Sequence, residues 1–365
     1  MSPICVEYIW IDANNQLRGK TKVMHSNVNY LDDLPDWNFD GSSTGQASGQ
    51  ESDIILKPRC IFNDPFRGNV NNKLVLCDTY TPEGNPLDNN NRHWANSIFN
   101  QNLNEEPWFG LEQEYFMIDP KTNLPLGFNK DNTQGQYYCS VGNNNAFGRQ
   151  IAEEHLHACT NANIKISGIN AEVAPGQWEF QIGPCTGIEQ GDHLWMARYL
   201  LLRIGEMFNI NIDFEPKPLK GDWNGSGCHA NYSTENMRNG TNGKKGLEYI
   251  NEAIEKLSKK HDEHMLVYGS GNNERMTGLH ETAAYDKFSY GVANRGSSVR
   301  IGIENTKNEK GYFEDRRPSS NCDPYLVTGI IFKTTCLDNE TNSNSNSSND
   351  ENNYTSLPDT PIAGI

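Results

Sequence analysis

Four glutamates stand in segments that the sequence otherwise predicts to be buried sheet. Glu112 and Glu114 lie within the largely apolar segment 108–116, and a β-strand there places both carboxylates on the same face. Two adjacent carboxylates on an apolar strand are costly unless a cation lies between them. The alternative is an edge strand that turns this face to solvent, and the segment taken alone favours that alternative.

The other two glutamates flank a Pro-Gly pair at 175–176. If this pair forms a two-residue turn, residues whose numbers sum to 351 lie opposite one another, which pairs Glu172 with Glu179. Their β-carbons would be about 4.5–5.5 Å apart, where like charges are destabilising. Carboxylates without neighbouring cysteines favour Mg²⁺ or Mn²⁺ over zinc as the cation that resolves this conflict. The pairing depends on the turn, because a slip of one residue separates the two side chains.

The remaining polar motifs are less specific. No convincing helix follows the glycine-rich segment 224–229, so it is a weak phosphate loop, and His229 alone is more often a packed side chain. Segment 261–264 is interpreted as a solvated helix face. Arginines gather in late polar loops, where surface ion pairing is the ordinary role for any single one, but together with the carboxylates they favour phosphoryl transfer. These arginines are Arg275, Arg295, Arg300, Arg316 and Arg317.

Length and charge limit the classes of protein. The chain has 365 residues, more than one core usually supports, so two domains are expected. The formal net charge of −16 disfavours nucleic acid and an anionic membrane surface as partners. No apolar run is long enough to predict a membrane span, and the N-terminus lacks the pattern of a signal peptide. Nine scattered cysteines favour reduced thiols and a cytoplasmic location.

The pattern of residues predicts three parts. Residues 1–82 alternate like strands, residues 83–338 mix strands and helices, and the Asn/Ser-rich residues 339–365 are predicted to be disordered. A small-residue loop at 39–45 is expected to be exposed. Strands are predicted at 6–11, 73–77 and 108–118, a hairpin at 164–184, and helices at 188–208, 247–260 and 323–337.

Seven ordered segments resemble eukaryotic-type glutamine synthetases. They lie at 37–44, 108–115, 170–173, 177–184, 221–229, 292–296 and 312–318, and include WNFDGSST, WFGLEQEY, GDWNGSGCH and YFEDRRP. The resemblance extends from about residue 4 to about residue 338. It implies an α+β fold, with a small N-terminal β-grasp-like domain at 1–82 and a larger catalytic domain at 83–338 built on a curved antiparallel sheet flanked by helices.

The resemblance implies an activity and its cofactors. Members of the family join ammonia to L-glutamate with ATP as co-substrate, giving L-glutamine through γ-glutamyl phosphate, a reaction of nitrogen assimilation. Two or more Mg²⁺ or Mn²⁺ ions are expected in each site. By resemblance, Glu114, Glu172 and Glu179 hold one metal, and Glu112, His229 and Glu314 hold the second. The family also implies a homo-oligomer of two stacked pentameric rings, with active sites between subunits.

Further roles carry over residue by residue from the same resemblance. The ATP site is implied to include Trp108, Glu112, Glu179, Pro184, Asn231, Tyr232, Ser233, Arg295, Arg300 and Tyr312. The glutamate site is implied to include Trp223, Asn224, Gly225, His229, Arg275, Arg295 and Arg316. Asp40, Ser43, Tyr138 and Glu281 are implied to bind ammonium. Asp40 would be the catalytic base, Glu281 the gate over the intermediate, and Arg295 a catalytic arginine.

Two other functions remain open at this point. One is an inactive structural or regulatory homologue, and the other is a ligase that uses an amine other than ammonia. The presence of all predicted metal ligands and ammonium residues favours an active ammonia ligase. The chain departs from the family pattern at Ala174, at Ser226 and around the gate at 284–288, and it lacks the usual helical N-terminal extension.

Overall fold

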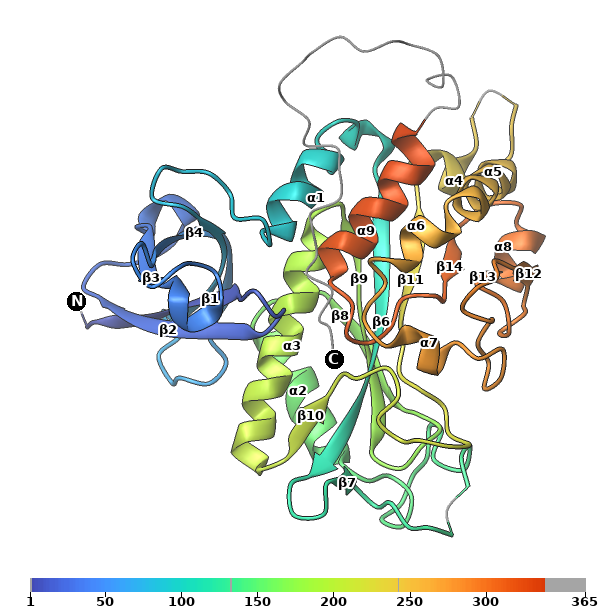
Figure 1. Cartoon of the computed structure of the whole chain (residues 1–365), viewed down its shortest axis with the longest axis horizontal. Coiled ribbons are helices and arrows are strands. Elements are labelled where there is room, and N and C mark those ends of the chain that lie inside the picture. Colours follow the sequence, from blue (N-terminus) through green and yellow to red (C-terminus); the bar gives the residue numbers. More distant parts are fainter. Residues whose placement is uncertain (1, 132, 242, 339–365) are drawn as a thin grey trace.

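The computed structural model describes residues 2–131, 133–241 and 243–338. A small sheet domain at the N-terminus lies beside a larger domain of sheet and helices (Figure 1), which confirms the predicted α+β class. The tail predicted to be disordered, 339–365, lies outside the described residues. Among the described helices, none has the length and apolar character needed to cross a membrane.

The N-terminal sheet has five strands in the order β2-β1-β5-β4-β3. Strand β1 lies between β2 and the central strand β5, antiparallel to β2 and parallel to β5. The bounds are β1 Ile4–Ile11, β2 Leu17–Met24, β3 Trp37–Asp40, β4 Asp53–Asn63 and β5 Lys73–Tyr80. The predicted strands at 6–11 and 73–77 are therefore confirmed.

Strand β1 joins the cores of the two domains. Its alternate residues Val6, Tyr8 and Trp10 pack in the small N-terminal core, whereas Ile9 belongs to the main core on the other face. This explains why the segment is apolar on both faces. Glu7 adds a polar tie, because Tyr199 on the long helix α3 (Glu189–Phe208) donates to its carboxylate at 2.5 Å.

The larger sheet has nine strands over the described residues, with the central order β12-β13-β14-β11-β6-β9-β8. Strands β7 and β10 pair with β6. The bounds are β6 Trp108–Asp119, β7 Leu124–Pro125, β8 Ile166–Ala171, β9 Gln177–Thr186, β10 Asn211–Asp213, β11 Cys228–Ser233, β12 Tyr290–Val292, β13 Val299–Ile301 and β14 Phe313–Asp315. Because β6 lies between β11 and β9, the alternative of an exposed edge strand is wrong.

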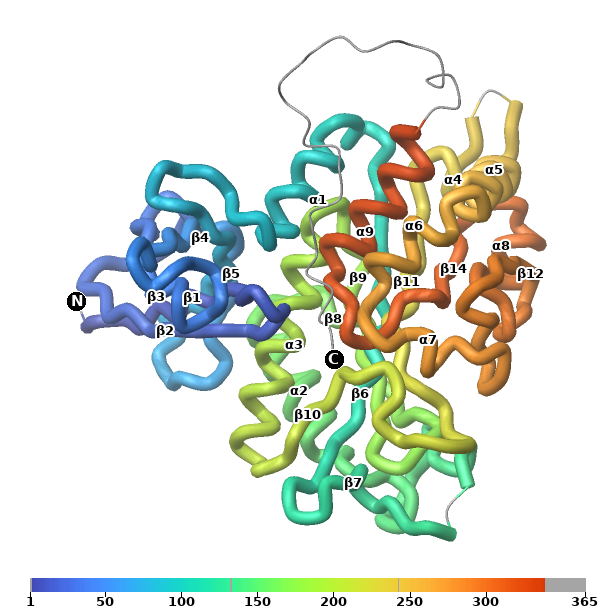
Figure 2. Tube along the Cα trace, in the orientation of Figure 1, coloured from blue at the N-terminus to red at the C-terminus, as the bar shows by residue number. Residues whose placement is uncertain are grey.

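Helices cover the sheet and line its ends (Figures 1 and 2). Helix α3 contacts β6 and β9, and α9 contacts α1 and α3. The bounds are α1 Asn91–Phe99, α2 Arg149–Asn161, α3 Glu189–Phe208, α4 Glu235–Asn239, α5 Gly246–Lys259, α6 His261–Met265, α7 Asn272–Arg275, α8 Ile303–Lys307 and α9 Pro324–Phe332. The predicted helices at 188–208 and 247–260 are confirmed, and the third ends earlier than predicted, giving way to a π-helical turn at Lys333–Leu337.

Buried polar contacts fix the sheet against α3. Gln113 points to the opposite face of β6 from its neighbouring glutamates and is fully buried. Arg198 on α3 donates to Gln113 Oε1 at 2.9 and 2.6 Å. One face of β6 therefore packs on a helix, and the other carries Glu112 and Glu114.

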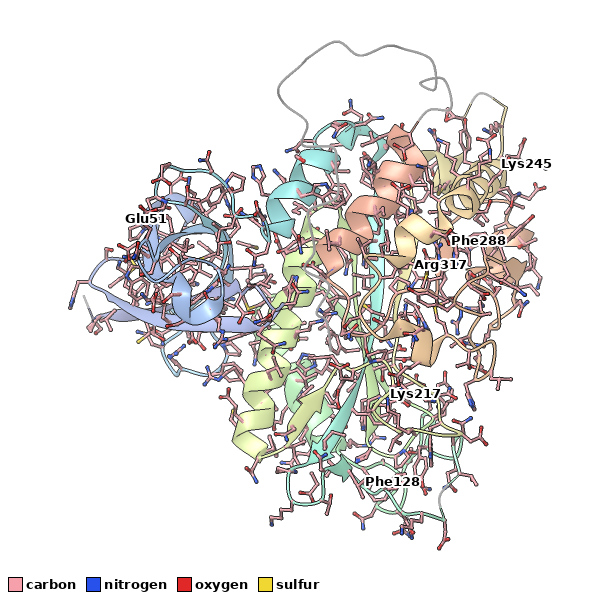
Figure 3. The ribbon with its side chains drawn as sticks, in the orientation of Figure 1. Glu51, Phe128, Lys217, Lys245, Phe288 and Arg317 are labelled. Atoms are coloured by element: carbon pink, nitrogen blue, oxygen red, sulfur yellow. The ribbon has the colours of Figure 1, made fainter. Side chains whose placement is uncertain are left out.

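The interpretation of 261–264 as a solvated helix face is wrong for its histidines. His264 is fully buried, with one ring nitrogen 2.7 Å from Tyr268 Oη and the other 2.8 Å from Thr334 Oγ1. His261 lies 3.2 Å from Nη1 of buried Arg317, which Figure 3 labels below α6. Histidine packs well between partners of this kind, and a helix of five residues carries too few positions for the pattern to show its buried side.

Candidate active site

Two groups of side chains that could hold metal ions share one face of the large sheet. Glu112 on β6 lies opposite His229 on β11, and Glu114 lies opposite Glu179 on β9. These register pairs bring side chains from three strands together beside the centre of the sheet. The two groups that result are Glu114, Glu172 and Glu179, and Glu112, His229 and Glu314, and within each group the candidate ligand atoms lie within 4.8 Å of one another.

The first group is held by amides at its edge. Glu114 Oε2 accepts from the backbone N–H of Gly227 at 2.6 Å. Asn170 donates to Glu172 Oε1 at 2.8 Å, and Gln181 donates both to Glu179 and to Asn170. These amides set the positions of the carboxylates but bring no positive charge.

Without a cation, the carboxylates of this group resist ionisation, and their pKa values are raised. Burial, followed in effect by the neighbouring glutamates, raises the pKa of Glu172 to about 8 and that of Glu179 to about 9. Burial also raises the pKa of Glu114 to about 7. A divalent ion that takes oxygen ligands fits this site, because it would offset the charge that the fold crowds together.

The sequence-based pairing of Glu172 with Glu179 is wrong by two residues. The turn forms where predicted, with Gln177 N–H donating to Ala174 O at 3.2 Å and Gly176 at φ 69°. The ladder beyond it, however, pairs Asn170 with Glu179, so that paired numbers sum to 349. A displacement of two residues keeps Glu172 on the same face, and it still reaches Glu179 as a diagonal neighbour.

The second group combines two carboxylates with a neutral imidazole. His229 Nδ1 is 3.5 Å from both Glu112 and Glu314. Burial and, after it, the nearby Arg316 hold the pKa of His229 well below its usual range, which keeps the ring neutral and able to bind a metal. Arg300 and Arg316 donate to Glu314 at 2.7 and 2.6 Å. Oxygen-rich groups with a single histidine suit Mg²⁺ or Mn²⁺.

A cleft of about 650 Å³ opens beside the second group. Glu112 contributes to both, since its side chain belongs to the group and lines the cleft. The predicted nucleotide residues on its wall are Trp108, Glu112, Pro184, Asn231, Tyr232, Ser233 and Tyr312. The other three, Glu179, Arg295 and Arg300, are not on this wall. Arg238 lies 3.9 Å from the centre of the Trp108 ring, which is 40% exposed at the mouth of the cleft.

None of the predicted glutamate residues is on the wall of this cleft. Trp223 packs on Phe128, which Figure 3 labels at the lower end of the larger domain. Gly225 is required by space, because a β-carbon there would lie 2.2 Å from Pro216 O and 2.5 Å from Arg275. Arg275 is itself buried and donates to the backbone oxygens of Arg316, Arg317 and Pro318 at 2.7–3.2 Å. Its burial lowers its pKa to about 10.

The four predicted ammonium residues are not all brought together in the chain. Tyr138 is half-exposed and has Glu172 and Arg295 among its electrostatic neighbours. Glu281 is exposed, and its backbone oxygen accepts from Arg316 at 3.2 Å. Asp40, in contrast, ends β3 in the N-terminal domain and Ser43 follows it in the next turn, and β3 lies far from α7 in Figure 1.

The Asp40 loop is organised internally. It forms a short 3₁₀ helix, Gly41–Thr44, whose N-cap is Asp40. The predicted exposure of the loop is correct for Asp40, Ser42 and Ser43, while Gly41 and Thr44 are buried. Hydroxyl groups of Ser42 and Ser43 donate to Asp40 at 2.7 and 2.6 Å and lower its pKa to about 2.

Sequence reasoning missed four polar side chains of the site. Gln181 could have been found, since it alternates with Glu179 on the same strand face. Asn170 could have been found in the same way, two positions before Glu172. Arg238 lies on α4, a helix of five residues, which is too short for a periodic pattern to mark it. Gln134 lies in an irregular segment, which has no periodic pattern either.

The fold and the site together match a class of protein. Carboxylate groups suited to divalent cations, arginines beside them and an adjoining cleft are typical of enzymes that transfer phosphoryl groups.

Comparison with known proteins gives the family. The family model described as "Glutamine synthetase, beta-Grasp domain" matches residues 4–82, and "Glutamine synthetase, catalytic domain" matches residues 91–360. A putative glutamine synthetase of Acanthamoeba polyphaga mimivirus is 55% identical over 334 residues, which cover 91% of this chain and 94% of that protein.

Plant proteins are similar over the same extent. The cytosolic isozyme 1-1 of glutamine synthetase from Oryza sativa subsp. japonica is 53% identical over 340 residues, covering 92% of this chain and 94% of that protein. A chloroplastic glutamine synthetase of Daucus carota is 53% identical, with 92% and 78% covered. The chain belongs to the glutamine synthetase family, in its eukaryotic type, and is an enzyme of the ligase class.

Proposed function

We propose that this chain joins ammonia to L-glutamate to give L-glutamine, using ATP and passing through γ-glutamyl phosphate, in nitrogen assimilation. One observation carries the proposal: Glu112 belongs both to a candidate metal group and to the wall of a nucleotide-sized cleft. That arrangement would place a nucleotide's terminal phosphate beside the carboxylates. The loop 223–225 and the gate are not on the wall of that cleft, and we propose that glutamate binds there.

The two carboxylate groups are proposed as the metal sites. Glu114, Glu172 and Glu179 would hold one ion, and Glu112, His229 and Glu314 the other, each Mg²⁺ or Mn²⁺. When bound, divalent cations supply positive charge that offsets repulsion between a triphosphate and a carboxylate. The raised pKa values of the first group favour this assignment, because burial and mutual repulsion outweigh the nearby positive charges of Arg275 and Arg316.

In the first half of the reaction, an oxygen of the substrate γ-carboxylate attacks the terminal phosphorus of ATP, and the bond to ADP breaks. Arg300 and Arg316 lie against Glu314 and would carry positive charge to the transferred phosphoryl group. Arg295 is exposed beside Arg316, whose Nε donates to its backbone oxygen at 3.2 Å. The substrate itself would be oriented by Trp223, Asn224, Gly225, His229, Arg275, Arg295 and Arg316.

In the second half, ammonium binds and loses a proton. Asp40 would accept that proton, with Ser43, Tyr138 and Glu281 completing the cation site. The nitrogen then attacks the carbonyl carbon of γ-glutamyl phosphate, and phosphate leaves. Glu281 would cover the intermediate and keep water out.

This assignment requires more than one copy of the chain. Since β3, which ends at Asp40, lies far from α7 in Figure 1, and Glu281 follows α7 by six residues, Asp40 would have to enter the site of a neighbouring subunit. We propose a homo-oligomer of two stacked pentameric rings with such shared sites. The rice relative is named as cytosolic and the carrot relative as chloroplastic, so a cytoplasmic location stays a prediction from the sequence.

The test is phosphate release and glutamine formation by the purified protein with Mg²⁺, ATP and glutamate. Release that needs both glutamate and ammonium, with an equal amount of glutamine, is expected. A parallel arm offers methylamine or ethylamine in place of ammonium, and faster turnover there would assign a different amine. No turnover from folded and assembled protein would instead indicate an inactive homologue.

A further inference from the structure

The proposed gate lies in a tight turn with an unusual backbone. Thr282 N–H donates to Leu279 O at 3.1 Å, and the two residues between them, His280 and Glu281, have φ angles of 53° and 59°. Two successive positive φ angles are typical of a type I′ turn, which normally has Asn or Gly at these positions. Since His and Glu both carry β-carbons, the turn is strained and needs contacts from outside to keep its shape.

Side chains from two directions hold this turn. Arg316 Nη2 donates to Glu281 O at 3.2 Å, and the same guanidinium donates to Glu314. On the other side, His280 lies between Gln134, with Nδ1 3.1 Å from Nε2, and Asp222, with Nε2 3.2 Å from Oδ1. The His280 side chain is only 15% exposed.

The direction of each hydrogen bond follows from the amide of Gln134. Its Oε1 accepts from the backbone N–H of Asn224 at 2.7 Å. Its Nε2 therefore faces His280, and an amide nitrogen can only donate, so Nδ1 of the imidazole is the acceptor. His280 Nε2 then carries the hydrogen and donates it to Asp222.

The result is a continuous link from Asn224 through Gln134 to His280. It connects the loop proposed to bind glutamate with the turn that carries Glu281. Asp222 contributes less, because its side chain is 97% exposed and solvent screens the contact. Gln134 is thus the partner through which the two loops affect one another.

We propose that His280 is a positioning residue that couples the gate to the glutamate-binding loop. This rests on the proposed function, because the role concerns protection of γ-glutamyl phosphate. A substrate that orders the loop at Asn224 holds Gln134 against His280, and the turn keeps Glu281 over the site. Without this link the strained turn relaxes, and water reaches the intermediate.

The readout is uncoupled turnover. Water that enters attacks the carbonyl carbon of γ-glutamyl phosphate, the bond to phosphate oxygen breaks, and glutamate and phosphate result. In His280→Leu, phosphate release that needs glutamate but no ammonium should rise about fivefold relative to glutamine formation, as loss of one hydrogen bond would give. A side chain that only stabilised the fold would lower both rates together and leave the ratio of glutamine to phosphate unchanged.

Two matched variants separate the two bonds of His280. His280→Asn keeps a polar atom near the position of Nδ1 and can still bind Gln134, whereas His280→Gln keeps one near Nε2 and can still bind Asp222. We expect Asn to retain a ratio close to that of the unmodified enzyme and Gln to resemble Leu. Asp222→Asn is the control and should keep the unmodified ratio.

Two results would overturn the proposal. One is a folded, assembled His280→Leu enzyme that keeps the unmodified ratio of glutamine to phosphate. The other is a pair of His280→Asn and His280→Gln variants that have the same ratio as each other. If the Leu variant does not assemble, the Asn and Gln pair decides the question. Failure of the proposed function shows separately, as an unmodified enzyme that makes no glutamine.

Discussion

Glu114 on β6 and Glu179 on β9 are direct partners in an antiparallel ladder, with both side chains on the face that carries the proposed metal sites. Burial leads the causes that raise the pKa of Glu114 to about 7 and that of Glu179 to about 9. Without a cation the pair therefore opposes folding when it ionises. The stability of the metal-free chain therefore favours an uncharged side chain at these positions, whereas the proposed activity needs a carboxylate that binds metal.

Glu179→Gln should separate the two demands. The folded pKa of about 9 exceeds the reference value of 4.5, so the folded chain binds more protons, and Glu179 destabilises the metal-free fold increasingly as pH rises from 4.5 to 9. The variant should melt at a higher temperature than the unmodified protein at pH 8 without metal. It should also show a smaller rise in melting temperature with Mn²⁺, because only the second metal group stays intact, and it should lose phosphate release.

The control for this variant is Glu235→Gln, which changes a glutamate on α4 outside both carboxylate groups. That variant should respond to Mn²⁺ as the unmodified protein does. Full phosphate release from Glu179→Gln would remove Glu179 from the proposed metal site.

Metal binding should release protons and become tighter with rising pH. The metal-free pKa values of about 7, 8 and 9 for Glu114, Glu172 and Glu179 mean that part of the group is protonated at pH 7, and a bound cation displaces those protons. Affinity for Mn²⁺ should rise from pH 6.5 to pH 9. Calorimetry in two buffers of different ionisation enthalpy measures the protons released, and a proton count of zero at pH 7 would contradict the assignment.

The comparison of sequence and structure is clearest at the hairpin. The alternation of Glu179 and Gln181 with apolar neighbours predicts which face carries the carboxylates, because that parity is a local property of a strand. The register is not local: Glu172 and Val173 stand outside the ladder before the turn, and the pairing moves by two residues. The sequence therefore predicts that these glutamates meet, but not which of them are direct partners.

Contacts between segments far apart in the sequence could not be predicted either, because they too are not local properties of the chain. Gln134 and His280 are 146 residues apart, and each lies in irregular chain without a periodic pattern. His264 is a similar case, since its partner Thr334 lies 70 residues further along. Only packing of the whole domain brings such pairs together, so their roles follow from the structure alone.

Acid should destabilise the fold through His155. This side chain on α2 is fully buried against Phe180, with Nε2 2.9 Å from Ala197 O, and burial lowers its pKa to about 4 from 6.5. The unfolded chain thus binds more protons between pH 6.5 and pH 4, so this contribution to stability is complete above pH 6.5 and is lost as pH falls. The difference corresponds to about 3 kcal/mol.

His155→Gln checks this contribution, since Gln can still donate to Ala197 O but has no titration in that range. Urea unfolding of the metal-free protein at several pH values should show a smaller loss of unfolding free energy between pH 6.5 and pH 4 than in the unmodified protein. His157→Gln, on the same helix outside the buried set, is the control and should leave the pH dependence unchanged. Equal slopes for His155→Gln and the unmodified protein would show that His155 does not contribute.

Mixing two slow variants should restore activity if sites are shared between subunits. Asp40 lies in the N-terminal domain and Glu281 beyond α7, and none of the contacts among the described residues joins them. In one chain, the serine hydroxyls hold the pKa of Asp40 at about 2, which makes it a weak base there. Its proposed role therefore requires the surroundings of a partner's site.

Asp40→Ala and Glu281→Ala should each form glutamine slowly, the first while still forming acyl phosphate. When the two variants are dissociated together and reassembled, about one quarter of the interfaces would combine an intact Asp40 with an intact Glu281, as random mixing across a two-sided interface gives. Glutamine formation should recover to about that fraction of the unmodified rate. Mixing the variants without dissociation is the control and should restore nothing, and no recovery after verified reassembly would place Asp40 and Glu281 in the same subunit's site or remove Asp40 from the reaction.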